Sequence, residues 1–70
     1  MSEDATGSRV AVDKVFRFEV WDFSGTECLS ETDYVEVAAA MMAGWATTGR
    51  RVSLVENRNK RRTDRVVVAQ

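Results

Sequence analysis

The chain has 70 residues and a formal net charge of −1, and it contains no histidine, no proline and one cysteine. Its length limits it to one small domain that buries only about 60% of the surface exposed by the unfolded chain, and its near-neutral charge argues against a dedicated nucleic-acid binder, which usually has a strongly basic domain. Because histidine is the commonest general base and metal ligand, and because Cys28 has no partner for a disulfide or a metal site, we expect no catalysis, no cofactor and no metal ion.

Residues 1–8 are polar and are expected to form a disordered tail, so the folded domain is expected to span residues 9–70. The start of the chain lacks the basic and apolar stretches of a signal peptide, and no apolar run approaches the roughly 20 residues of a membrane span. Together with the single cysteine, these features predict a cytoplasmic protein that does not enter a membrane. Residues 9–12 fit an edge strand and a lead-in to the next element equally well.

Residues 15–23 alternate between two kinds of side chain, which predicts a strand with two unlike faces. One face carries Phe16, Phe18 and Val20, and the other carries Val15, Arg17, Glu19 and Trp21. A turn at residues 24–26 could bring residues 27–29 back as a short paired strand.

Residues 31–47 have the spacing of an amphipathic helix, and Gly49 is placed to end it. A serine or threonine in the segment 30–33 could cap its first turn, where acidic residues are also favourable. The expected core stripe consists of Tyr34, Val37, Ala38, Met41 and Trp45. The rest of the helix is small and uncharged after Glu36, so that a second helix could approach closely and form a homodimer. The alternative is that these alanines only favour helix formation.

Residues 51–56 and 65–69 are predicted to be the last two strands, joined by the polar loop 57–63 in an antiparallel hairpin. The expected fold is therefore α+β, with one helix packed on one face of a three- to four-stranded, mostly antiparallel sheet, in the order β-(β)-α-β-β. The expected core consists of Phe16, Phe18, Val20, Val52, Leu54, Val66 and Val68 from the sheet, with Tyr34, Met41 and Trp45 from the helix.

A single helix covers one face of such a sheet, so the other face is expected to be open. By alternation, this open face carries Arg17, Glu19, Trp21, Arg51, Ser53, Val55, Arg65 and Val67. Tryptophan and arginine are the residue types in which binding energy concentrates, which favours a docking face. The alternative is a solvated face on which Trp21 lies flat across its neighbours.

Positive charge is concentrated in the last third of the chain. Residues 49–70 carry seven basic and two acidic residues, whereas residues 1–48 carry three basic and nine acidic ones. Much of the basic charge falls in one run in the predicted loop, made of Arg58, Lys60, Arg61 and Arg62. Such a run could follow a phosphate backbone, meet an acidic protein or be solvated, and the acidic part of one copy could meet the basic part of another.

We expect a small non-catalytic protein-interaction module whose partner is another protein, for example one that itself binds nucleic acid. The expected contact residues are Arg17, Trp21, Arg51, Arg58, Lys60, Arg61, Arg62 and Arg65. A nucleic acid bound by the loop 57–63 is the alternative partner, with Trp21 stacking on a base. The weakest candidate is a divalent-cation site built from three acidic residues, Glu19, Asp22 and Glu27.

In its size and in its order of strands and helix, the chain resembles small orphan proteins of phages and mobile elements. Some of these proteins inhibit host machinery by stoichiometric binding. No diagnostic residue carries this resemblance, which implies only an inhibitor or an accessory factor.

Overall fold

The computed structural model describes residues 14–70, and the predicted tail 1–8 and the predicted strand at 9–12 lie outside these residues. The described chain contains the strands β1 (Phe18–Asp22), β2 (Cys28–Thr32), β3 (Val52–Asn57) and β4 (Arg65–Ala69) and the helix α2 (Val35–Thr47), with short 3₁₀ helices η1 (Arg58–Lys60) and η2 (Arg62–Asp64) before β4.

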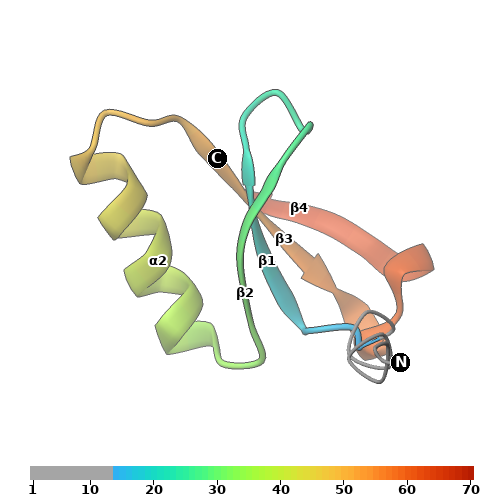
Figure 1. Ribbon diagram of the computed structural model, residues 1–70. Helices are drawn as coiled ribbons and strands as arrows, with labels where there is room; N and C mark the ends of the chain where they lie inside the picture. The colour runs from blue at the N-terminus through green and yellow to red at the C-terminus, as the bar shows by residue number, and fades with distance from the viewer. Residues whose placement is uncertain (1–13) are drawn as a thin grey trace, which may run out of the picture.

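The four strands form one sheet in the order β2-β1-β3-β4, and each neighbouring pair is antiparallel. The helix α2 connects β2 to β3, which lie on either side of β1, and it covers one face of the sheet (Figure 1). The predicted α+β fold and its order of elements are therefore confirmed.

The core lies between α2 and the two central strands. Buried side chains come from both layers, and half-buried apolar side chains surround them. The buried set is Phe18, Val20, Val52 and Leu54 from the sheet with Ala38 from the helix, and the surrounding set is Leu29, Met41, Met42 and Trp45. Alternation along β1 and β3 correctly predicted the four sheet residues of this core, but Phe16, which was also expected there, precedes β1 and does not belong to it.

The helix begins at Val35, later than predicted, because the preceding residues are used by β2. Thr32 pairs with Phe18 in the sheet, and its Oγ1 accepts a hydrogen bond from the backbone N–H of Tyr34 at 3.2 Å. Tyr34 is thus the residue at the helix N-cap, with extended backbone and a side chain that is 67% exposed. The predictions that Tyr34 and Val37 belong to the core are therefore wrong, since Val37 is also exposed.

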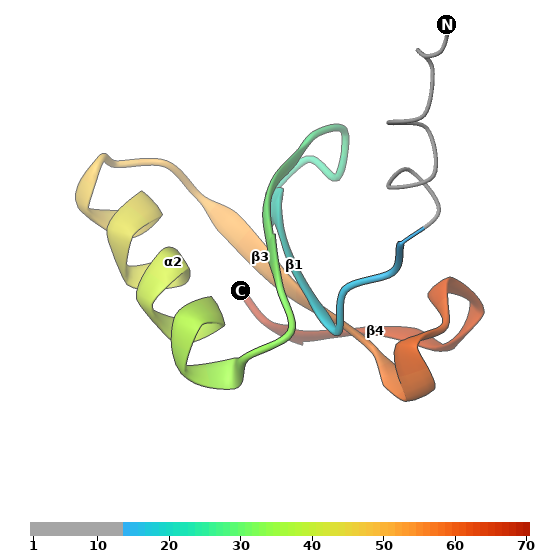
Figure 2. The same cartoon turned by 60° about the horizontal axis from the view of Figure 1, so that its bottom comes forward.

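The strand β4 is also more exposed than predicted. All five of its residues are exposed, including Val66 and Val68, which were expected in the core. A helix is about 10 Å wide and neighbouring strands lie about 4.8 Å apart, so one helix cannot shield a sheet of four strands. The helix packs against β1, β2 and β3, and β4 lies on the side of the sheet away from it (Figures 1 and 2).

The connection between β3 and β4 consists of the two short helices η1 and η2 rather than a simple hairpin turn. Asn59 and Lys60 have positive φ angles of 56° and 53°, which reverse the chain direction inside η1. This connection projects beyond the end of the sheet (Figure 2). The basic residues therefore lie on a compact, turned segment that follows the most buried strand, β3.

Candidate functional site

The open face of the sheet contains a buried carboxylate. Glu19, in β1, is only 4% exposed although no helix within residues 14–70 covers this face. It accepts a hydrogen bond from Trp21 Nε1 at 2.7 Å and another from Asn57 Nδ2 at 2.9 Å. Its Oε1 also lies 3.5 Å from Nη2 of Arg65. A buried carboxylate needs such partners, so Glu19 fixes three side chains from β1, β3 and β4 at one place.

Trp21 and Arg65 form a stacked pair above this carboxylate. The guanidinium carbon of Arg65 lies 5.2 Å from the centre of the Trp21 ring, within the range of a cation–π contact. The Trp21 side chain is half-buried and lies across the sheet. Its indole N–H is held by Glu19, so the pair is ordered in the free protein.

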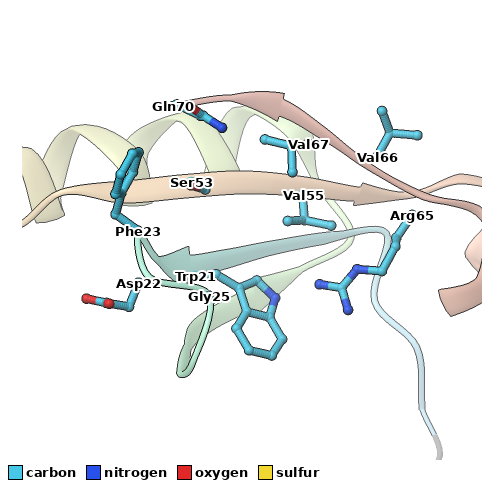
Figure 3. Close-up of a pocket in the computed structure, with 10 residues that line it drawn as sticks. All are labelled: Trp21, Asp22, Phe23, Gly25, Ser53, Val55, Arg65, Val66, Val67 and Gln70. Carbon is cyan, nitrogen blue, oxygen red and sulfur yellow. The ribbon is translucent and has the colours of Figure 1, made fainter.

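A hollow of about 380 Å³ lies beside the stacked pair on the open face. Ser53, which pairs with Trp21 across β1 and β3, supplies a small side chain where a larger one would fill the space. Figure 3 shows Trp21 and Arg65 on one side of this hollow and Phe23 on another. The lining residues are Trp21, Asp22, Phe23, Gly25, Ser53, Val55, Arg65, Val66, Val67 and Gln70.

A second arginine–aromatic contact lies beside the open face. The guanidinium of Arg51 lies 4.1 Å from the centre of the Phe23 ring, and the Phe23 side chain is 44% exposed. Within residues 14–70, Arg51 makes no ion pair with a carboxylate. Arg51 does not line the hollow beside Trp21, but lines another of about 420 Å³ with Phe23 and with Met42 and Ala46 of α2.

A smaller hollow of about 350 Å³ lies on the β2 side, and Trp21 and Arg65 line it as well. Cys28 also lines it, and burial together with the charges of Glu19 and Glu31 raises the pKa of the Cys28 thiol. The thiol form is therefore favoured at neutral pH, whereas a nucleophilic cysteine needs its thiolate. This geometry suits contact with a partner better than covalent chemistry.

The structure separates the predicted contact residues into groups. Trp21 and Arg65 lie together on the open face, as alternation predicted, whereas Arg51 precedes β3 and lines a hollow with Met42 and Ala46 of α2. Arg17 does not join them, because it precedes β1 and its side chain pairs with Glu56 at 3.1 Å on the helix side of the sheet. The expectation that Arg17 belongs to the open face is wrong.

Two residues of the basic run are neutralised by acidic side chains. Lys60 Nζ lies 3.1 Å from Oδ1 of Asp33, and Arg58 Nε lies 3.4 Å from Oε1 of Glu56. The backbone N–H of Arg17 and the Lys60 ammonium lower the pKa of Asp33, and the Arg17 and Arg58 guanidinium groups lower the pKa of Glu56. These contacts hold the segment against the body of the protein.

The other two residues of the run, Arg61 and Arg62, are exposed. In the described part of the chain neither pairs with a carboxylate, and Arg62 donates a hydrogen bond to the carbonyl of Lys14 at 3.4 Å. Their charge is therefore the part of the basic run that can act on a partner.

The three acidic residues considered for a cation site do not gather. Asp22 and Glu27 both pair with Arg50, at 3.3 and 3.1 Å, whereas Glu19 lies on the open face. Hydrogen bonds from Ser24 lower the pKa of Asp22. Among residues 14–70, no group of three metal-ligating side chains is close enough to hold an ion, and no helix is long and apolar enough to cross a membrane.

Sequence reasoning missed the partners of Glu19. Asn57 was seen only as a polar loop residue, yet it ends β3, is fully buried and donates to both Glu19 and the carbonyl of Phe16. The only signal in the sequence was the position of Asn57 directly after an alternating run.

Comparison of the chain with models of protein families, with curated proteins and with solved structures finds no match.

Proposed function

We propose that this chain is a small non-catalytic protein-interaction module that docks on an acidic protein partner through the open face of its sheet. The observation that carries the proposal is the Trp21–Arg65 stack beside a hollow of about 380 Å³ on a face that no helix covers. The resemblance to small proteins of phages and mobile elements supports an inhibitor or an accessory factor.

The order of the stacked pair supports a binding role. Fixing a flexible side chain at an interface costs roughly 0.5–1.5 kcal/mol, and this loss is avoided when the side chain is already fixed in the free protein. Trp21 and Arg65 are held by Glu19, and both belong to the residue types that dominate interface energies.

The chemistry of the hollow indicates what the partner must offer. Its walls include the aromatic rings of Trp21 and Phe23 and the side chain of Val67, and these favour an inserted apolar side chain. Arg65 also lines the hollow, so a carboxylate beside the inserted group would meet its guanidinium group. An acidic segment with an exposed apolar residue fits both features.

The experiment is capture of proteins from cell extract on the immobilised chain, followed by mass spectrometry. We expect a captured protein to be lost with Trp21→Ala and with Arg65→Ala and to be retained with Tyr34→Ala, which removes an exposed aromatic ring from the helix side. A partner that is retained by both open-face variants would refute this docking site.

The alternative function is nucleic-acid binding by the segment 57–63, and the observation in its favour is the exposure of Arg61 and Arg62. Fluorescence anisotropy with labelled single- and double-stranded DNA and RNA at two salt concentrations tests it. For single strands each neutralised phosphate contributes about 0.7 to the slope of log affinity against log salt. The double variant Arg61→Ala/Arg62→Ala should then lower the slope more than Arg51→Ala does, whereas absence of binding at low salt would favour the protein-docking function.

A further inference from the structure

The outer edge of the sheet is formed by β4, whose free side is not paired with another strand of the described chain. It presents three consecutive valines, and Val66, Val67 and Val68 are 38%, 52% and 42% exposed. Native proteins usually protect such an edge with lysine, proline, a bulge or a covering element, because it can pair with another chain. An edge as apolar as β4 is therefore a pairing site.

Two features of β4 bear on this pairing. Its bulge lies near its end, where Val55 pairs with Val67 and Leu54 with Ala69 and Val68 has no partner in β3, whereas residues 65–67 keep a regular register. The helix α2 packs against the other three strands and leaves the β4 side chains uncovered.

We propose that β4 pairs antiparallel with β4 of a second copy, which joins the two sheets into one continuous sheet. The distribution of charge along β4 is compatible with β4 of a second copy as the partner strand. Residues 66–69 carry no charge, and antiparallel pairing centred on Val67 places Arg65 of one copy near Ala69 of the other. The two Arg65 guanidinium groups therefore lie at opposite ends of the paired segment, and valine meets valine between them.

The other edge of the sheet is a poorer partner for β4. The strand β2 carries an exposed carboxylate, Glu31, together with the polar residues Ser30 and Thr32. A head-to-tail contact between β4 and β2 would place the valines against this polar edge and would repeat without closing. The symmetric β4 pair closes after two copies and buries only apolar side chains at its centre.

Antiparallel pairing of identical strands has its two-fold axis perpendicular to the sheet. Both α2 helices then lie on one side of the joined sheet, and both Trp21–Arg65 pairs lie on the other. The dimer leaves the proposed docking face free and presents two copies of it in the same direction.

The test is sedimentation of the full chain at concentrations from low micromolar to near millimolar, with two matched variants. Val67 and Val35 are 52% and 55% exposed, so Val67→Lys and Val35→Lys place the same charge at equally exposed sites on β4 and on α2. We expect the parent chain and Val35→Lys to form a dimer and Val67→Lys to remain a monomer with an unchanged circular dichroism spectrum.

Three results would overturn the β4 dimer. These are a monomeric parent chain at every concentration, a dimer that survives Val67→Lys, and a dimer that is lost only with Val35→Lys, which would place the interface on the helix. Hydrogen exchange of the parent chain gives a second readout that needs no variant, since the amides of residues 65–69 should exchange more slowly as concentration rises. Trp21→Ala should leave the dimer intact, which separates this test from the test of the docking face.

Discussion

At the scale of single residues, the Glu19–Asn57 contact joins segments that are far apart in sequence. Both nitrogen-bound protons of the Asn57 side chain are used, one by Glu19 and one by the carbonyl of Phe16. Its Oδ1 is buried without a hydrogen-bond partner in the structure. Position 57 therefore needs a side chain that donates hydrogen bonds, and a side chain that only accepts them could not replace asparagine.

Replacing Asn57 should destabilise the fold more than replacing an exposed polar residue does. Asn57→Ala leaves the buried Glu19 with one partner fewer and should lower the free energy of unfolding by about 1–3 kcal/mol. Asn57→Asp should lower it further, because it places a second carboxylate where Nδ2 lies 2.9 Å from Glu19. Urea unfolding measures both changes.

The control for these variants is Asn59→Gly in the adjacent turn. Asn59 is exposed and has a φ angle of 56°, which glycine adopts without strain. Asn59→Gly should change the free energy of unfolding by no more than about 0.5 kcal/mol. Equal effects at the two asparagines would contradict the role assigned to Asn57.

The sequence predicted the apolar residues of the strands but could not predict this polar contact. Alternation placed Phe18, Val20 and Leu54 on one face because each strand has a period of two. The hydrogen bond from Asn57 to Glu19 spans 38 positions and depends on the register between β1 and β3. No local pattern specifies that register.

At the scale of elements, the two glycines of the helical region have opposite roles. Gly44 lies inside α2, and a Cβ added there would meet no other atom within 4 Å. Gly49 follows the helix with a φ angle of 81°, which other residues adopt only with strain. Equivalent substitutions should therefore change stability in opposite directions.

Gly44→Ala should raise the free energy of unfolding by about 0.4–1 kcal/mol, because alanine restricts the unfolded chain and favours the helix. Gly49→Ala should lower it by about 1–2 kcal/mol through the left-handed backbone. Thermal and urea unfolding measure both. A loss of stability in Gly44→Ala would mean that a surface packs closely on α2, contrary to the β4 dimer.

The ion pairs of the basic segment predict a loss of stability in acid. Asp33 and Glu56 both have a lowered pKa in the folded protein because of their hydrogen bonds to Arg17, Lys60 and Arg58. Each contributes stability that is complete above the pKa of the unfolded chain, about 4, and that is lost as the pH falls through the folded value. Urea midpoints should therefore be constant above about pH 5 and should fall as the pH is lowered further.

Removing the two carboxylates tests this assignment. The double variant Asp33→Asn/Glu56→Gln should be less stable than the parent at neutral pH and should depend less on pH. Glu36→Gln is the control, because Glu36 makes no ion pair within residues 14–70. A pH dependence that is unchanged in the double variant would show that other groups cause the acid sensitivity.

The elements themselves were predictable, whereas their ends and their exposure were not. The helix was predicted to start near residue 31 from its polar residues, but the segment 28–32 gains more hydrogen bonds as a strand beside β1. The valines of β4 have the composition of a buried strand, yet their exposure depends on which strands the single helix can reach. The alternation of residues along a strand does not show which strands of the sheet the helix covers.

At the scale of the whole molecule, the fold brings the acidic and basic parts of the sequence together. Lys60 pairs with Asp33, and Arg50 pairs with Glu27, so residues from the basic end neutralise residues from the acidic part within one chain. The uneven distribution of charge along the sequence predicted contacts between copies, but several of these charges form ion pairs within one chain. Two of the surfaces that remain exposed are the Trp21–Arg65 face and the β4 edge.

These two surfaces should be separable in one binding experiment that depends on both proposals. If the β4 dimer presents two docking faces in one direction, a densely immobilised partner can be held by both faces, and linking two sites raises apparent affinity by about 10²–10⁴-fold. Val68→Lys, which places a charge in the paired strand at a residue that does not line the hollow, should then weaken binding to the dense surface while binding to a sparse surface stays unchanged. Trp21→Ala should weaken binding at both densities because it removes the contact itself. Equal losses at both densities for Val68→Lys would instead place β4 in direct contact with the partner and would contradict the dimer as the source of the effect.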